Sequence, residues 1–149
     1  MVLDDIDRRL IQQVQVDGRA SYGELGAIVG LSVSAINERL KKLQAQKIIR
    51  GWRAEIDPKA IGLEVLAFVY VQLDRPNHER DFKQVVLTFE EVEECHHITG
   101  EWSYLMKVRA KSISALECLI SEKIKASEGI VRTQTVIVLS SPKEWTPLK

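Results

Sequence analysis

Hydrophobic residues recur at helical spacing in the first part of the chain and predict three short helices. Their apolar stripes are Ile6, Leu10 and Val14; then Tyr22, Leu25 and Ile28; then Val33, Ile36, Leu40 and Leu43. Ser21 with Glu24 three residues later is a capping-box pattern, which opens the second helix. Gly30 is expected to end that helix because glycine adopts the left-handed backbone of a helix C-cap without strain. Ser32 then caps the third helix.

The pattern becomes mixed after residue 60. Apolar and β-branched runs predict strands over Val65–Leu73, Val92–Thr99, Tyr104–Ala110 and Ile130–Leu139. Helical spacing connects Phe82, Val85, Val86 and Phe89, and again Ile113, Leu116, Ile120 and Ile124. The resulting order, β-α-β-β-α-β, is that of a ferredoxin-like domain.

These two patterns divide the chain into two domains with a linker between them, and they place it in the α+β class. Residues 1–50 are predicted to form a winged-type helix-turn-helix domain, because three short helices with a tight glycine turn fit that motif. Residues 51–62 are expected to be a hinge strand or linker, since Ile48–Ile56 has the pattern of a strand that leads into the Asp57-Pro58 break. Residues 63–149 form the predicted ferredoxin-like domain.

Composition describes an ordinary folded protein with no net charge. The 149 residues carry 21 Lys and Arg against 21 Asp and Glu, and 45% of the residues are hydrophobic. This balance excludes a uniformly basic nucleic-acid coat. No apolar run approaches the roughly 18 residues that a membrane helix needs, and the acidic N-terminus lacks the apolar core of a signal peptide. Cys95 and Cys118 are too few for a disulfide framework, so we expect reduced thiols, a cytoplasmic location and no membrane partner.

Basic residues are concentrated around the end of the third predicted helix. Between residues 36 and 53 the chain carries Arg39, Lys41, Lys42, Lys47, Arg50 and Arg53, against Glu38 as the acid in that stretch. A local basic cluster in a neutral chain is typical of a nucleic-acid contact, although a solvated helix face fits the same charges.

The third predicted helix has the two faces that a DNA-recognition helix needs. Its apolar stripe leaves Ser34, Asn37, Glu38, Lys41 and Lys42 facing outward. Asparagine can pair with adenine and glutamate can accept from cytosine, while lysine can take phosphate or guanine. We therefore expect this helix to enter a groove of double-stranded DNA.

Polar residues at the helix starts have two interpretations each. Ser21 and Tyr22 are placed to contact phosphate through a hydroxyl and a helix N-terminus. Ser21 and Ser32 are equally suited to capping alone, and Glu38 to an ion pair with a neighbouring lysine. Arg39 fits either packing on the domain or reaching the DNA backbone.

An ordered set of motifs along the whole chain resembles the Lrp/AsnC family of feast/famine transcriptional regulators. In the first half the matching segments are Leu3-Asp4-Asp5-Ile6-Asp7, Asp17-Gly18-Arg19, Glu24-Leu25, Val29-Gly30-Leu31-Ser32-Val33-Ser34, Arg39-Leu40 and Leu43. Further on they are Ile49-Arg50-Gly51-Trp52, Ile56-Asp57-Pro58, Gly62, Thr99-Gly100-Glu101-Trp102 and the final strand Thr133–Leu139.

The resemblance implies a DNA-binding helix-turn-helix, a hinge strand and a ferredoxin-like domain for effector binding and oligomerisation. By this analogy the DNA contacts fall on Ser32, Ser34, Asn37, Glu38, Arg39 and Lys42. Family members form homodimers through the sheets of their C-terminal domains, and four dimers often assemble into an octameric ring. Small effectors, usually amino acids, bind in clefts between dimers and change assembly or DNA affinity.

The expected effector site combines the Gly100 loop with the last strand of a neighbouring dimer. Its residues are Thr99, Gly100, Glu101, Trp102, Ser103, Thr133 and Thr135. Gly100 allows close backbone approach and Trp102 supplies an apolar wall, while Glu101 offers a carboxylate for an ammonium group. The same residues fit a plain hairpin turn and an interface anchor, and threonine is also a common strand residue.

Two positions depart from the family pattern. Lys47 stands where the family usually has the glycine that ends the recognition helix, so we expect Lys47 to adopt a left-handed backbone. Ser103 replaces an acidic residue that commonly follows the loop glycine, which weakens the expected contact to an amino-acid ammonium group.

The sequence contains only weak motifs for metal binding or catalysis. Cys95-His96-His97 suggests a metal site, but alternation along a strand puts His96 on the opposite face from its neighbours, so we expect no metal. No nucleophile triad, P-loop or dinucleotide fingerprint is present, so we expect no cofactor and no catalytic residues. Two alternatives stay open: a decarboxylase of the same two-domain plan, with His96 or His97 as the acid, and an architectural DNA-binding protein whose effector cleft is vestigial.

Overall fold

Residues 3–148 are described by the computed structural model, and their elements fall into two units with separate cores. The first unit comprises residues 3–55 together with 143–148, and the second comprises residues 56–142. Each unit has its own cluster of buried side chains. Within residues 3–148, no helix is long and apolar enough to span a membrane.

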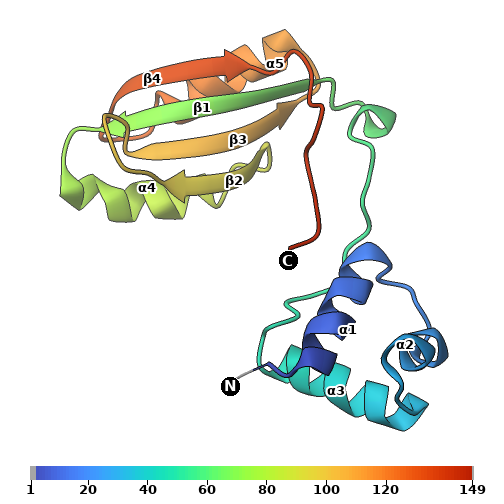
Figure 1. The fold of residues 1–149 in the computed structure, drawn as a ribbon. Helices are drawn as coiled ribbons and strands as arrows, with labels where there is room; N and C mark the ends of the chain where they lie inside the picture. Colours follow the sequence, from blue (N-terminus) through green and yellow to red (C-terminus); the bar gives the residue numbers. More distant parts are fainter. Residues whose placement is uncertain (1–2, 149) are drawn as a thin grey trace. The chain divides into compact units, whose positions relative to one another are not determined.

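Three helices build the first unit: α1 (Asp5–Val16), α2 (Tyr22–Val29) and α3 (Val33–Ala45) (Figure 1). Its buried side chains are Leu10, Val14, Leu25, Val29, Ile36, Leu40 and Leu43. Three residues assigned to the apolar stripes lie outside this core, because Tyr22, Ile28 and Val33 are 43%, 43% and 56% exposed. Val29 packs beside Leu25 instead of Ile28, since residues four apart share a helix face.

The turn between α2 and α3 is tight for local reasons. Gly30 ends α2 with φ +77°, the left-handed conformation expected of it. A Cβ atom on Gly26 would collide with the carbonyl oxygen of Leu31, so only glycine lets the chain turn this closely. Ser21 with Glu24 forms the predicted capping box, and the Ser32 hydroxyl caps α3 by accepting from the Ala35 amide. These contacts confirm the helix-turn-helix.

Lys47 ends α3 in the left-handed region, with φ +57°, as its position in the sequence predicts. The Ile48 amide donates to the Leu43 carbonyl at 2.9 Å, and the Lys47 amide donates to the Gln44 carbonyl at 2.9 Å. This pair of bonds is a Schellman motif, which normally places glycine where Lys47 stands.

The strand predicted at Ile48–Ile56 is not formed. Since this strand would have been part of the predicted wing, the described residues of the first unit contain no wing. A strand needs a neighbouring strand for its backbone groups, and in residues 3–55 the ordered elements are all helices. Trp52 instead lies against Gly18, where an added Cβ would come within 3.3 Å of the indole ring. The segment is therefore held to the helical unit by its side chain.

The last described residues return to the first unit. The Gln15 side chain donates to the Leu148 carbonyl at 3.1 Å and accepts from the Leu148 amide at 2.8 Å. The expected domain boundaries gave no such role to the C-terminal tail. The boundary between the two units, at residues 55 and 56, lies inside the expected linker of 51–62.

The second unit is an antiparallel sheet with the order β2-β3-β1-β4. Its strands are β1 (Val65–Leu73), β2 (Val92–His97), β3 (Tyr104–Ala110) and β4 (Ile130–Ile137). Its two helices are α4 (Glu79–Val86) and α5 (Ile113–Cys118), and α5 continues as the π-helical segment η3 (Leu119–Ile124). Two short 3-10 turns are η1 (Lys59–Ile61) and η2 (Pro76–His78).

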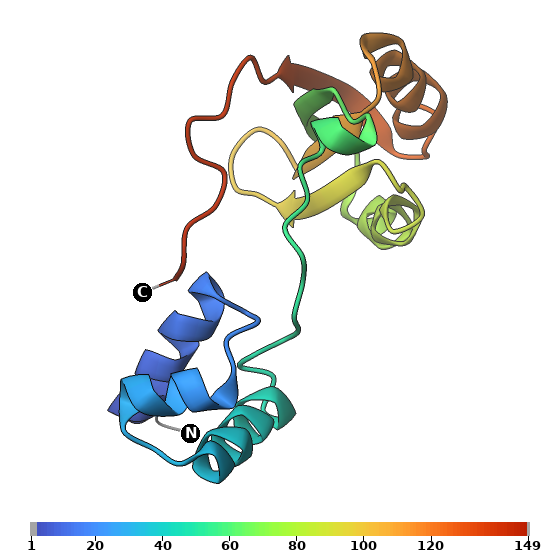
Figure 2. The same ribbon diagram turned by 90° about the vertical axis from the view of Figure 1, so that its right-hand side faces the viewer.

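Helix α4 and the continuous α5–η3 helix cover the same face of the sheet (Figure 2). The predicted β-α-β-β-α-β order is confirmed.

Some predicted element ends move by a few residues. Phe89 lies beyond α4 but remains buried, because the turn after the helix folds back onto the core. β2 ends at His97 and β4 at Ile137, two residues before the predicted ends. Gly129, with φ +84°, precedes β4 above His78, and a Cβ there would lie 2.5 Å from the His78 ring.

Strand register divides the sheet into two unlike faces. The residues that face the helices are buried, and they include Ala67, Val69, Val71, Tyr104, Met106 and Val108. The opposite, open face carries Phe68, Tyr70, Leu105 and Val136, which are half-buried or exposed within one chain. An open apolar sheet face of this kind is typical of an interface with another molecule.

Candidate functional site

The outward face of α3 carries the residues expected to contact DNA. Ser34, Glu38 and Lys42 are exposed, and Asn37 is half-buried on the flank of the helix. Glu38 and Lys41 form an exposed ion pair, with 3.7 Å between oxygen and nitrogen. Such a pair at i, i+3 contributes little to stability. It leaves both groups available to a ligand.

Serine hydroxyls at the helix starts act as caps in the structure. The Ser21 hydroxyl and the Ser21 amide each donate to the Glu24 carboxylate at 2.7 Å. These two bonds lower the pKa of Glu24 below its ordinary value. The Ser32 hydroxyl lies 3.1 Å from the Ser34 hydroxyl and accepts from the Ala35 amide at 3.3 Å. Tyr22 is exposed beside the cap of α2. The hydroxyl groups of the three serines and of Tyr22 therefore lie on exposed parts of the unit, at the N-termini of α2 and α3.

Arg39 is engaged within the domain. Its guanidinium donates to Asp4 and Asp7, with 2.7 Å between nitrogen and oxygen in each pair. Asp7 is 8% exposed, so this ion pair is partly desolvated and ties α3 to the start of α1. The hydrogen bonds from the Asp7 amide and, second, from Arg39 lower the pKa of Asp4. Of the two interpretations of Arg39, the free protein adopts the one in which the side chain packs on the domain.

Basic residues at the end of α3 and after it remain unpaired within the described residues. Lys42, Lys47, Arg50 and Arg53 are exposed, and none of them forms an ion pair with another residue in the described range 3–148. The end of α3 and the segment after it therefore carry positive charge that no ion pair neutralises within the described residues. This distribution suits a phosphate backbone.

The Gly100 loop carries an internal ion pair that the sequence interpretation missed. Glu101 binds Arg132 of β4, and the Arg132 guanidinium lies 4.3 Å from the centre of the Trp102 ring. Trp102 in turn packs at 5.7 Å from Tyr70 of β1. Strand alternation alone predicts that Arg132 lies on the opposite face from Thr133. Its ion-pair partner Glu101 is 31 residues away in the sequence, so no local pattern predicts the pair.

Ser103 closes the loop through three hydrogen bonds. Its amide donates to the Val71 carbonyl at 2.9 Å, its carbonyl accepts from the Ile98 amide at 3.1 Å, and its hydroxyl accepts from the Leu73 amide at 3.1 Å. The Leu73 amide lies where the register of β1 and β4 shifts, so the hydroxyl satisfies a donor at that irregularity. Ser103 therefore has a structural role in this chain.

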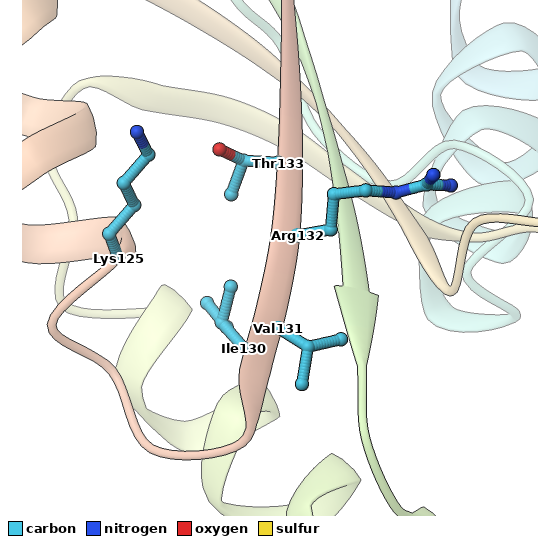
Figure 3. A pocket seen from close by; sticks show the side chains of 5 residues that line it. All are labelled: Lys125, Ile130, Val131, Arg132 and Thr133. Atoms are coloured by element: carbon cyan, nitrogen blue, oxygen red, sulfur yellow. The ribbon is translucent and has the colours of Figure 1, made fainter.

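Thr133 and Thr135 lie on the other face of β4, toward the helices. They line an open groove of about 460 Å³ between β4 and the α5–η3 helix, together with Glu117, Ile120 and Lys125. Figure 3 shows Thr133 and Lys125 on the same side of β4, with Arg132 on the opposite side. Within one chain, the Gly100 loop and the two threonines therefore lie on opposite sides of β4. The expected site takes these two parts from neighbouring dimers.

The Cys95-His96-His97 segment does not gather ligands around one point. Cys95 packs against the core, and burial raises the pKa of its thiol. His97 stacks on Tyr104 at 4.9 Å, while His96 points to the open face and lies 3.0 Å from Glu94. Within residues 3–148, no group of three His, Cys, Asp or Glu side chains is arranged to hold a metal ion.

Two family models match the chain. Residues 3–44 match the AsnC-type helix-turn-helix domain, and residues 66–148 match the Lrp/AsnC ligand binding domain. The first match covers the helical unit and the second covers the sheet with the C-terminal tail.

Characterised relatives span nearly the whole chain. The HTH-type transcriptional regulator LrpA of Mycobacterium tuberculosis is 39% identical over 139 residues, which cover 93% of this chain and 91% of the relative. The leucine-responsive regulatory protein of Escherichia coli is 35% identical over 95% of this chain and 88% of its own length.

Solved structures agree with the fold. A transcriptional regulator of Neisseria meningitidis in complex with L-methionine superposes with a TM-score of 0.94 at 30% identity, over 99% of this chain and 97% of the other. A feast or famine regulatory protein of M. tuberculosis, complexed with L-methionine, gives a TM-score of 0.90 at 37% identity, over 96% of both chains. AsnC of E. coli gives 0.92 at 30% identity, over 98% of both.

Proposed function

Since the chain belongs to the Lrp/AsnC family of transcriptional regulators, we propose that α3 reads its DNA sites and that an amino acid adjusts this binding. Asn37, Glu38 and Lys42 are the residues assigned to base edges. Ser21, Tyr22, Ser32 and Ser34 are assigned to phosphate. The cytoplasm, which holds the DNA, is the proposed place of action.

The observation that carries this proposal is the exposed polar face of α3 beside unpaired positive charge. Ile36, Leu40 and Leu43 hold the helix to the core, so the opposite face is free to enter a groove. Arg39 is assigned a positioning role, because its ion pairs to Asp4 and Asp7 set the orientation of α3 on α1.

The experiment is a binding titration on DNA sites selected with the purified protein, followed by fluorescence anisotropy at several salt concentrations. A dimer making three or four phosphate contacts per half-site should give a log–log salt slope of about −6. Lys42→Ala should weaken binding and make the slope shallower by about one, while Asn37→Ala should mainly relax base preference. Lys111→Ala, the same charge change in the second unit, is the matched control. An affinity that does not change with salt would refute DNA binding through this surface.

The amino-acid effector is proposed from the ligand-binding family match and from two related structures that contain L-methionine. The Gly100 loop residues Thr99, Gly100, Glu101, Trp102 and Ser103 and the β4 residues Thr133 and Thr135 are proposed to meet across neighbouring dimers. Titration calorimetry against the twenty amino acids tests whether the protein has such an effector.

The proposed homodimer uses the open face of the sheet. Phe68, Tyr70 and Leu105 form an apolar patch there, and covering it would remove that surface from water. Phe68→Glu should convert the dimer to monomers in light scattering. Leu87→Glu, at a residue that is 79% exposed away from this face, should leave the mass unchanged. A dimeric Phe68→Glu protein would refute this interface.

A further inference from the structure

The groove between β4 and the α5–η3 helix carries its own pair of opposite charges. Thr133, Thr135 and Ile137 form its floor and the helix forms its wall. Glu117 and Lys125 both line this groove, and Lys125 also borders the adjoining hollow beside Ile130 and Thr133. The groove therefore combines apolar side chains and hydroxyl groups with one acidic and one basic residue.

Neither charged group has a partner in the described structure. Glu117 and Lys125 are exposed, and no ion pair joins either of them to another residue within 3–148. Neighbours on the same helix are engaged, since Lys123 binds Glu91 at 2.7 Å and Glu122 accepts from the Cys118 thiol at 3.2 Å. Glu117 and Lys125 are thus the groove's available anion and cation.

The pair of opposite charges suits a small zwitterion. Glu117 lies in α5 and Lys125 directly follows the π-helical segment η3, so both side chains come from the helical wall of the groove. Both side chains are long enough to converge on a ligand whose ammonium and carboxylate groups are neighbours. The Thr133 and Thr135 hydroxyls add hydrogen bonds, and Ile120 and Ile137 offer apolar surface to a side chain.

In the described structure the carboxylate of the Gly100 loop is already paired, so the loop offers such a ligand no free carboxylate. Glu101 is paired with Arg132, and the Ser103 hydroxyl is occupied by the Leu73 amide. An ammonium group at the loop would have to displace Arg132 from Glu101. At the groove it would meet Glu117 without displacing a partner.

The geometry points to this groove as the ammonium- and carboxylate-binding part of the effector site, with Glu117 holding the ammonium and Lys125 the carboxylate of an apolar α-amino acid. This assignment rests on the proposed amino-acid effector and adds to it the residues that recognise the charged groups. The ligand's apolar side chain lies against Ile120 and Ile137.

The test is calorimetry with L-methionine and two analogues that each lack one charge, the matching 2-oxo acid and L-methioninamide. Glu117→Gln should weaken L-methionine about tenfold and leave the 2-oxo acid unchanged, because the oxo acid has no ammonium. Lys125→Met should weaken L-methionine by a similar factor and leave the amide unchanged. Glu122→Gln and Lys123→Met make the same charge changes on the same helix and serve as controls.

The outcomes separate the assignment from the function it rests on. If the wild-type protein binds L-methionine and Glu117→Gln and Lys125→Met bind it equally well, while Glu101→Gln binds it less, the charged groups are read at the loop and the assignment is wrong. If the wild-type protein binds none of the twenty amino acids, the proposed effector function fails and the assignment fails with it. Equal melting temperatures for the variants exclude a folding defect.

Discussion

Lys47 offers a direct test of how the recognition helix ends. Its φ of +57° is a conformation that costs a residue with a Cβ roughly 1–2 kcal/mol, whereas glycine adopts it freely. Glycine also gains about 0.4–1 kcal/mol of chain entropy in the unfolded state, which opposes the benefit. Lys47→Gly should therefore stabilise the first unit by about 0.5–1 kcal/mol.

The assay is differential scanning calorimetry of the full chain. For a unit of this size a stabilisation of 1 kcal/mol raises the melting temperature by about 4–8 °C, so the transition of the helical unit should rise by roughly 2–8 °C. Lys47→Ala is the matched control because it removes the charge and keeps the Cβ. Lys47→Asn should fall between the two, since asparagine tolerates the left-handed region better than other residues with a side chain.

One outcome would contradict the reasoning. If Lys47→Gly melts no higher than Lys47→Ala, the backbone at Lys47 carries no strain, and the two Schellman hydrogen bonds to Leu43 and Gln44 hold the helix end without cost. The glycine and alanine variants should also lose DNA affinity equally, because both lack the ammonium group.

Three further predictions follow from contacts within the units. Arg39→Ala should destabilise the first unit by about 1–3 kcal/mol in urea titration, because it leaves the Asp7 carboxylate buried without its partner; an unchanged midpoint would refute this. The pKa of Asp4 is depressed in the fold, so its contribution is present above its unfolded pKa and is lost as the pH falls through the folded value; Asp4→Asn should flatten this acid limb of a stability–pH curve. Gly129→Ala should lower the melting temperature more than Gly100→Ala, since both have positive φ and only the Gly129 position would collide with a side chain.

The helices and the sheet topology were predictable because their signals are local. The limits of β1 at Val65–Leu73 and of β3 at Tyr104–Ala110 agree with the apolar runs. Capping at Ser21 and the stop at Gly30 also need only neighbouring residues. The Ile48–Ile56 prediction was wrong because a strand-like pattern does not form a strand without a second strand to pair with.

Long-range partners could not be predicted in the same way. Arg39 has the charge and the helix position expected of a DNA contact. Its guanidinium nevertheless donates to Asp4 and Asp7, which lie more than 30 residues earlier in the sequence. Nothing in the spacing of α3 distinguishes it from Lys42, which is free of ion pairs within the described residues. Residue type limits which partners are possible, and tertiary packing decides which of them are present.

The effector prediction combined two surfaces for the same reason. Alternation along β4 predicts that Arg132 and Thr133 lie on opposite faces of the sheet, but it does not predict which residues their side chains contact. In the fold, Arg132 neutralises Glu101 on one side, and Thr133 borders the groove of Glu117 and Lys125 on the other. The charge that the loop lacks at Ser103 is therefore available on the helix side, where the sequence interpretation assigned no charged residue.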